Sequence, residues 1–284
     1  MTPTQVEQRV IQELKDNGIS IIKLSEILPA EIFTEISQWA EGLLQEPETK
    51  RRIREIEKGV RPDSKSDKFF IVRPLGDMPS VSIEDRIVQV ALSDPIMRIV
   101  CGYLGMFSRV AALDLWYNVA TPGPDYKSQR WHRDPEDTRI VKTFLYLRDV
   151  AETNGPFCYI PGSHNGGPFR EVYPQRVALG VYPKDGAVDA RFPPNLRKVC
   201  TGEAGTFVLC DTTGFHRGGH PIEGGRLVFN AVYTTNAAAP MIAKSKQFSI
   251  RAPHSQLAQL PLLLSPAASY AIGHITGSAR MTSS

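Results

Sequence analysis

The stretch DTTGFHRGGHPIEGGRLVFNAVY, residues 211–233, decides the fold class. Its first half is rich in glycine and therefore predicts turns, whereas the half that begins at Arg226 is β-branched and aromatic, as in a strand. Similar short runs precede it from about residue 108: RVAALDLWYNVA, RIVKTFLYLRDV, GPFCYIPGS and GTFVLCD. Several short strands separated by Gly, Pro, Asn and Asp predict a sandwich or a barrel.

The chain before residue 108 has mostly helical patterns. The stretch TPTQVEQRVIQELKDNG, residues 2–18, predicts a helix with Thr2 as N-cap, Pro3 at the first helical position and Gly18 as C-cap. The β-branched run ISIIKL that follows it suits a strand.

Two further stretches of this first part have helical spacing. In residues 29–46, Ile32, Ile36, Trp39 and Leu43 share one face of the predicted helix. Residues 82–105 predict one or two helices, broken at Pro95.

The order of elements, helices first and then strands without regular alternation, argues against a doubly wound parallel sheet. We therefore expect a mainly β fold with a helical N-terminal part (α+β), in a single domain over 1–284. Within it, 1–107 is a mostly helical support region, 108–236 is the core that carries the site, and 237–284 is a C-terminal extension.

Composition sets few limits on function. A net charge of +3 and 42% hydrophobic residues fit a globular protein and do not argue for nucleic acid or a membrane as partner. The four cysteines have no paired spacing, which predicts free thiols. No secretory signal or long apolar run is visible, so the cytoplasm is the expected location. The charged segment 50–68 predicts a solvated helix and loop; alternatively, it is a basic flap over an anionic substrate.

Histidine and carboxylate spacing predicts a metal site. His132 and Asp134 form H-x-D, and side chains two residues apart on an extended strand end point the same way. His216 follows 82 residues after Asp134, and Arg226 ten residues after His216. Two histidines and one carboxylate on one face, with open positions, are typical of non-haem Fe(II) oxygenases. An arginine in this place suits the far carboxylate of a bound oxo-acid, which it can hold in a fork.

These residues resemble a known family. WHRD, GPFCYIPGSH and FHRGG…GGR, in this order and spacing, are similar to the phytanoyl-CoA dioxygenase family of Fe(II)- and 2-oxoglutarate-dependent oxygenases. The resemblance spans roughly residues 108–236 and, more loosely, ELKDNGISIIKLSEIL near the N-terminus. It implies a double-stranded β-helix, or jelly roll, whose helices brace one sheet.

The resemblance also implies roles for individual residues. His132, Asp134 and His216 would be the iron ligands, and Arg226 would hold the distal carboxylate of 2-oxoglutarate. Asn118 resembles a polar cosubstrate contact, and Phe144 matches a position that lines the pocket in relatives, although it is equally well explained as a core residue. Gly218 departs from relatives that carry a serine there, so that Asn118 or water would have to replace the serine's contact with the cosubstrate.

The remaining polar residues near these motifs have ordinary interpretations. We expect His164 to form hydrogen bonds with the backbone of a turn. The glycines around His220 exclude a helix in which His216 and His220 could share zinc. We expect His254 and His274 to lie outside the site. Lys142 and Arg148 flank the TFLYL strand and are assigned to the surface by default, with one of them able to face the barrel mouth. Within WHRDPED, Arg133 should point away from the metal, Pro135 should end the strand, and Glu136 and Asp137 should be loop residues.

The implied reaction is oxidation of an unactivated C–H of a small molecule, with 2-oxoglutarate and O2 as cosubstrates and succinate and CO2 released. Two alternatives remain open: a non-catalytic jelly-roll binding protein, and a cupin-type metal-dependent isomerase or hydrolase. The second has no need of an arginine ten residues after the last ligand. No motif identifies the substrate or the oligomeric state, and segment 50–68 slightly favours an anionic substrate.

Overall fold

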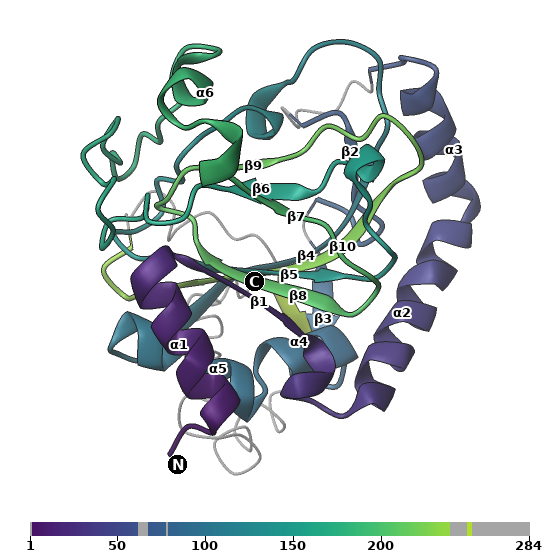
Figure 1. The fold of residues 1–284 in the computed structure, drawn as a ribbon. Coiled ribbons are helices and arrows are strands. Elements are labelled where there is room, and N and C mark those ends of the chain that lie inside the picture. Colours follow the sequence, from purple (N-terminus) through teal and green to yellow (C-terminus); the bar gives the residue numbers. More distant parts are fainter. Residues whose placement is uncertain (1, 62–67, 78, 239–248, 252–284) are drawn as a thin grey trace, which may run out of the picture.

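Two antiparallel sheets form the centre of the molecule (Figure 1). The computed structural model describes residues 2–61, 68–77, 79–238 and 249–251. The large sheet has the strand order β1 (Ile19–Lys23), β8 (Thr206–Asp211), β5 (Val141–Tyr146), β10 (Gly225–Thr234), β4 (Arg109–Val119) and β2 (Ile71–Val72). The small sheet has the order β7 (Lys198–Cys200), β6 (Phe157–Tyr159) and β9 (His216–Gly218). A parallel pair, β3 (Ser80–Ser82) and β11 (Ser249–Arg251), lies outside both.

The α-helices other than α6 (Ala187–Arg191) cover the large sheet on the side away from the small sheet, whereas α6 lies on the side of the small sheet (Figure 1). These covering helices are α1 (Gln5–Asn17), α2 (Ala30–Gln45), α3 (Pro47–Glu57), α4 (Arg86–Ala91) and α5 (Asp94–Leu104). Short 3-10 helices are η1 (Leu24–Glu26), η2 (Lys127–Gln129), η3 (Glu152–Asn154) and η4 (Pro194–Leu196). Figure 1 shows α1, α4 and α5 beneath the large sheet, with α2 and α3 along one side. Two facing sheets braced by helices on one of them are the predicted jelly roll.

Alternation along the central strands divides the core into two layers. In β10, Leu227 and Phe229 pack toward the helices, whereas Val228 packs between the two sheets. The same parity holds in β5, where Leu145 faces the helices and Phe144 faces the small sheet. Because both faces of β10 are covered, all ten of its residues are buried, which explains its nearly continuous apolar sequence. Even-numbered positions of β5, of β10 up to Val232 and of β4 from Ala112 onward therefore face the side of the small sheet; a register shift places Val110 of β4 on the helix side.

The first helix begins two residues later than its sequence predicts. Its N-cap is Thr4, not Thr2, because Thr4 and Glu7 form a reciprocal capping box. The predicted C-cap is correct: Gly18 has φ +75°, and a Cβ there would lie 2.3 Å from the Tyr159 hydroxyl. Glycine is thus required for the backbone conformation and for the close approach of β6.

The second helix packs on the core through most of the predicted face, but not through Trp39. Ile36, Ala40 and Leu44 are buried, Ile32 and Leu43 are partly buried against the same core, and Trp39 is 38% exposed. The burial follows the side that meets the sheet and α4, which the spacing of large apolar residues does not reveal. The break at residue 95 is correct in place, but Pro95 lies in the first turn of α5 and starts that helix.

The first 107 residues also contribute to the sheets. β1 and β2 are the two outer strands of the large sheet, so this region supplies strands as well as helical support. The cysteines are free, as expected. Most of the C-terminal extension, His254 and His274 included, lies outside the described residues.

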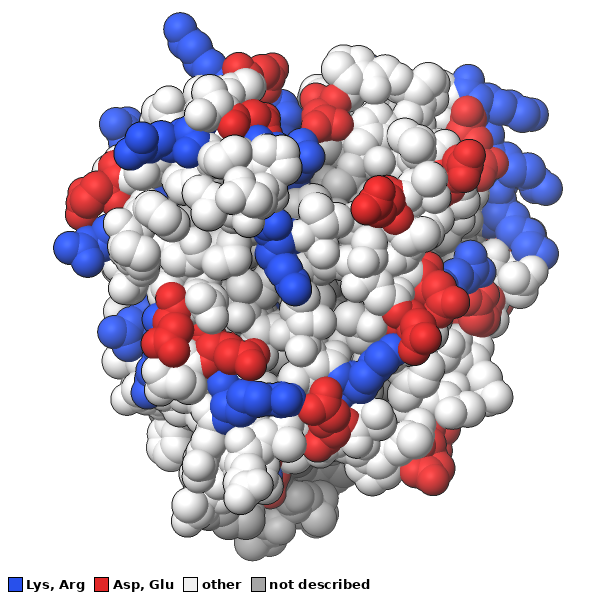
Figure 2. Space-filling view, in the orientation of Figure 1, with Lys and Arg blue, Asp and Glu red and all other residues white. Residues whose placement is uncertain are grey.

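Charges of both signs are interspersed on the face shown in Figure 2. Blue side chains gather at the right edge, where Figure 1 places α3, and this helix forms the first part of the basic segment 50–68. Residues 62–67 of that segment lie outside the described ranges. Among the helices that the structure describes, none is long and apolar enough to span a membrane.

Candidate metal centre

The backbone brings His132 and His216 together, although 84 residues separate them. Each donates its backbone N–H to the backbone carbonyl of the other, and both N···O distances are 3.0 Å. The sequence suggests that the H-x-D stretch is the end of a strand. In the structure it is not part of a regular strand, because it pairs only through single bridges. The backbone N–H of Asp134 donates to the Thr212 carbonyl at 2.9 Å and fixes the third member beside the other two.

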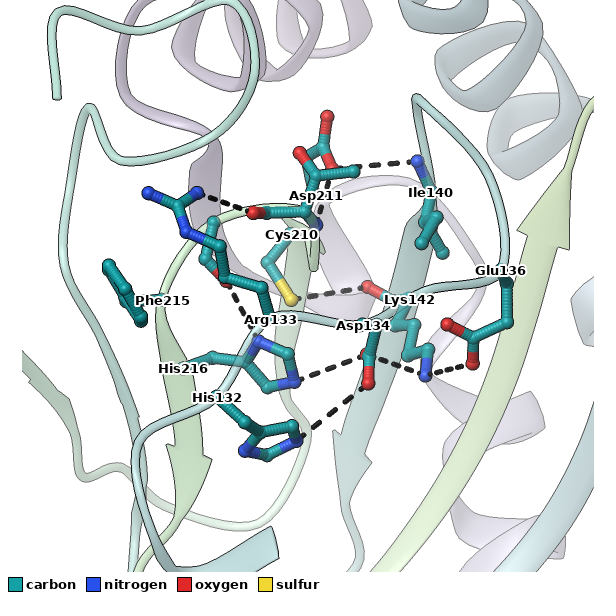
Figure 3. A network of polar contacts seen from close by, with 12 residues as sticks. His132, Arg133, Asp134, Glu136, Ile140, Lys142, Cys210, Asp211, Phe215 and His216 are labelled. Carbon is teal, nitrogen blue, oxygen red and sulfur yellow. Dashed lines mark hydrogen bonds and ion pairs between the residues drawn. The ribbon is translucent and has the colours of Figure 1, made fainter. Parts of the chain in front are cut away.

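The three side chains converge on one point (Figure 3). Their possible ligand atoms, the ring nitrogens of His132 and His216 and a carboxylate oxygen of Asp134, all lie within 4.8 Å of one another. His216 Nε2 is 3.2 Å from Asp134 Oδ2, and His132 Nε2 is 3.7 Å from Asp134 Oδ1. All three residues are buried. Among the described residues, this is the one cluster of His, Cys, Asp or Glu with such a spacing.

Backbone carbonyls select the ligating tautomer of both histidines. His132 Nδ1 lies 2.8 Å from the Arg130 carbonyl and His216 Nδ1 lies 2.9 Å from the Gly214 carbonyl. A carbonyl only accepts, so Nδ1 carries the proton and Nε2 presents its lone pair to Asp134 and the space beside it. Burial, with His216 nearby, also holds the pKa of His132 well below its usual value. The His132 imidazole is therefore neutral, as a metal ligand must be.

Lys142 lies inside the molecule, so its default assignment to the surface is wrong. Its Nζ lies 2.7 Å from Asp134 Oδ2 and 3.0 Å from Glu136 Oε1, and its side chain is only 13% exposed. Burial raises the pKa of Asp134, but Lys142 and the two histidines outweigh it and hold that pKa well below its usual value. One signal was available: Lys142 is two residues before Phe144, so both must face the same side of β5.

Arg226 lies at the far end of the same inner face, opposite Asn118 of β4. It is 5% exposed, and its Nη1 donates to the Gly155 carbonyl. Its Nε is buried without a hydrogen-bond partner, and no carboxylate of the described residues pairs with it. Burial lowers its pKa. A buried guanidinium without a carboxylate partner destabilises the fold unless a bound anion compensates its charge.

One pocket joins the triad to Arg226. Its empty space, including the mouth, is about 480 Å³. Phe144 and Asn118, both singled out from the sequence, line it, and so does Gly218, where a Cβ would stand 3.2 Å from Arg226 Nη2. Lys142, one of the two residues expected to be able to face the barrel mouth, also lines it. Sequence reasoning missed several of its other wall residues: Lys68, Phe70, Ile71, Trp116, Ser128 and Phe157. Phe144 packs on Phe157 across the two sheets, with ring centroids 4.6 Å apart, so it serves both the core and the wall.

The remaining WHRDPED residues turn away from the triad. Arg133 points to the opposite side in Figure 3, as predicted, and is fully buried there. Glu136 reaches the centre only through Lys142, and Asp137 accepts hydrogen bonds from the backbone and side chain of Thr235.

Of the histidines that the structure describes, His164 and His220 contact backbone carbonyls outside the cluster. His164 Nε2 meets the Lys15 carbonyl of α1 at 3.1 Å, a more distant partner than the turn expected for it. His220 Nε2 lies 2.7 Å from the Thr121 carbonyl. Arg148 pairs with Glu41 and is half-exposed, in agreement with its assignment to the surface.

Comparison with solved structures identifies the fold. The epimerase SnoN, solved with Fe3+, α-ketoglutarate and nogalamycin RO, shares 19% identity over 82% of this chain and 85% of its own, with a TM-score of 0.55. EctD from S. alaskensis, with 2-oxoglutarate and 5-hydroxyectoine, shares 17% identity over 80% and 75%, with a TM-score of 0.51. HygX from Streptomyces hygroscopicus, with nickel, 2-oxoglutarate and hygromycin B, shares 15% identity over 82% and 88%, with a TM-score of 0.51.

A comparison with curated proteins finds no match. The family model described as phytanoyl-CoA dioxygenase matches residues 16–220, which is more than half of the chain and includes His132, Asp134 and His216. The chain therefore belongs to the phytanoyl-CoA dioxygenase family of Fe- and 2-oxoglutarate-dependent oxygenases.

Proposed function

We propose that this enzyme oxidises an unactivated C–H of a small-molecule substrate at an Fe(II) held by His132, Asp134 and His216. The observation that carries the proposal is the convergence of two imidazoles and one carboxylate beside a buried guanidinium without a carboxylate partner among the described residues. The donor set fits Fe(II): two nitrogen ligands and one oxygen ligand on one side, with positions left open. When bound, iron together with 2-oxoglutarate and O2 supplies the oxidising power, with succinate and CO2 released.

The protein's own residues orient the cosubstrate. In this proposal Arg226 binds the distal carboxylate of 2-oxoglutarate through Nε and Nη2, since Nη1 is engaged by Gly155. Asn118 lies opposite Arg226 in the sheet and offers an amide beside the same space. Burial of the pocket strengthens these contacts, because a charge-assisted hydrogen bond is worth more away from water.

We further propose that the substrate has an apolar body and an anionic group. Trp116, Phe70 and Ile71 supply apolar wall, and Lys68 lies in the same wall with its ammonium 5.6 Å from the centroid of the Trp116 ring. A lysine beside an aromatic face suits a ligand that combines a negative charge with apolar surface. A panel of carboxylated and uncharged small molecules, compared by succinate release, tests this: equal rates with both classes would contradict it.

Anaerobic reconstitution tests the main proposal. Purified metal-free protein is given Fe(II) and then 2-oxoglutarate, and we expect a visible chelate absorption band, followed by succinate on admission of air. A non-catalytic binding protein would give no succinate. A cupin-type isomerase or hydrolase would bind metal without consuming 2-oxoglutarate. Absence of both band and succinate would refute the proposal.

A further inference from the structure

We propose that Lys142 is a positioning residue for the metal ligand Asp134, and that Glu136 holds Lys142 in place. This inference rests on the proposed function, because it concerns how the chain prepares its carboxylate for a metal. Lys142 and Phe144 occupy successive inward positions of β5, so the lysine enters the centre from the large sheet. His132 and Asp134, by contrast, come from an irregular segment held by single bridges.

Lys142 forms its ion pair with one of the two carboxylate oxygens of Asp134. The ammonium lies 2.7 Å from Oδ2, which is also 3.2 Å from His216 Nε2, while Oδ1 lies 3.7 Å from His132 Nε2. Because the ammonium occupies one lone pair of Oδ2, Lys142 disfavours an ion that binds both oxygens and favours coordination through a single oxygen of Asp134. Binding through one oxygen leaves positions open for a bidentate cosubstrate and O2.

Glu136 fixes the ammonium from the other side. Its Oε1 lies 3.0 Å from Lys142 Nζ, and the two carboxylates flank the lysine in Figure 3. Both Glu136 and Lys142 are nearly buried, with exposed side-chain fractions of 15% and 13%. The two ion pairs therefore restrict the ammonium to one place, which an exposed lysine on a flexible stem would not keep.

Whether loss of the Lys142 ammonium weakens or tightens metal binding distinguishes a positioning role from a purely electrostatic one. A positive charge this close repels a dication, so removal of the charge alone would tighten metal binding. Loss of an outer group that orients a ligand weakens metal binding, typically by about 10–100-fold. We expect Lys142→Met, which keeps the unbranched stem and loses the ammonium, to weaken binding by about that factor.

The experiment is anaerobic titration of the metal-free full chain with Co(II), followed by its d–d absorption spectrum. For Lys142→Met we expect a dissociation constant raised by about tenfold or more, and a changed spectrum, because the carboxylate can now bind through both oxygens. Lys23→Met is the matched control: Lys23 pairs with Glu203 at the surface, and its side chain is 41% exposed. A merely structural role for Lys142 would lower the melting temperature and leave Co(II) affinity and spectrum as in the wild type, which would overturn the inference.

Glu136→Gln provides the second variant if Lys142→Met does not fold. It keeps the contact between Lys142 and Asp134 and weakens the other anchor, so we expect a smaller loss of Co(II) affinity in the same direction. Wild-type affinity or tighter binding in this variant would overturn the inference. Failure of the wild-type protein itself to bind Co(II) would instead refute the proposed function, so the two failures are distinguishable.

Discussion

Two arginines near the centre, Arg133 and Arg226, are both buried but have different surroundings. Arg133 Nη1 donates to the Ser163 and Thr213 carbonyls and its Nη2 to those of Phe169 and Val172. Arg226 Nη1 donates to the Gly155 carbonyl, and the residue lines the pocket beside the triad. Each arginine has a buried Nε without a hydrogen-bond partner, but carbonyls of its own fold occupy both terminal nitrogens of Arg133 and only Nη1 of Arg226 lies against one. Arg226 is therefore the one of the two that is placed to bind a ligand.

Arg226→Ala should raise the apparent KM for 2-oxoglutarate by at least about tenfold, with metal binding retained. Hydrogen bonds to charged groups are worth about 1.5–3 kcal/mol, and about 1.4 kcal/mol is a factor of ten. Succinate formation measured against 2-oxoglutarate concentration gives the KM. Arg148→Ala is the control, since Arg148 pairs with Glu41 away from the pocket. An unchanged KM in Arg226→Ala would show that another group holds the cosubstrate.

Arg133→Met should lower the free energy of unfolding by roughly 2–5 kcal/mol, because it leaves buried carbonyls without donors. The guanidinium also stacks on Phe215 at 4.1 Å, and burial lowers its pKa to about 10. Urea denaturation followed by circular dichroism measures the loss. Arg9→Met, at a half-exposed ion pair with Glu26, serves as comparison. A loss below about 1 kcal/mol, typical of surface substitutions, would contradict this account.

At the scale of elements, Glu7 ties the first helix to the helix beneath the sheet. Its carboxylate caps the N-terminus of α1 through the Thr4 backbone N–H at 2.9 Å. The same carboxylate accepts from Arg98 Nε and Nη2 of α5, at 2.9 and 2.8 Å. One buried side chain thus fixes both the start of α1 and its docking, which explains why the helix begins at Thr4 instead of Thr2.

Glu7→Gln should destabilise the protein by roughly 1.5–3 kcal/mol near neutral pH. Burial raises the pKa of Glu7, but its bonds to Arg98 and Thr4 outweigh burial and leave the pKa below its ordinary value of 4.5. The folded form therefore favours the ionised carboxylate, and its contribution is complete above 4.5 and lost as the pH falls through the depressed pKa. Urea midpoints of wild type and variant should converge at acidic pH. Glu48→Gln, at an ion pair with Arg51 whose side chains are more than half exposed, should change the urea midpoint much less than Glu7→Gln does.

For the whole molecule, the proposed metal joins segments that are far apart in the sequence. His132 and Asp134 lie before β5, and His216 begins β9 of the small sheet, so a bound ion would link the small sheet to the segment that leads into the large one. A ligand that binds only the folded form stabilises it, by about 2.7 kcal/mol at a hundredfold excess over its Kd.

Mn(II) or Co(II) at that excess should therefore raise the melting temperature by about 5–10 °C for a chain of this size. Asp134→Ala should abolish the shift, and a chelator should reverse it in the wild type. Asp77→Ala, at a side chain 62% exposed, should keep the full shift. Calorimetry or thermal circular dichroism measures these values. A wild-type melting temperature insensitive to either ion would argue against a metal at this site.

Much of the fold follows from local pattern. Short β-branched and aromatic runs between turn residues predicted β1, β4, β5, β6, β8 and β10, because strand propensity and turn residues act locally. Exposure of Trp39 and burial of Ala40 in α2 could not be predicted, since they depend on which neighbour the helix meets. The positions of β1 and β2 at opposite edges of the large sheet likewise depend on contacts with strands far away in the sequence.

The sequence by itself determined the family, the β-rich core and the candidate ligands His132, Asp134 and His216, because residue type and spacing carry that information. Tertiary structure alone decided that both imidazoles present Nε2, since carbonyls of Arg130 and Gly214 hold the other nitrogen. It also decided that Lys142 is buried beside Asp134, and that Arg226 faces an enclosed space without a carboxylate partner among the described residues. These features depend on distances between segments far apart in the chain, which only packing sets.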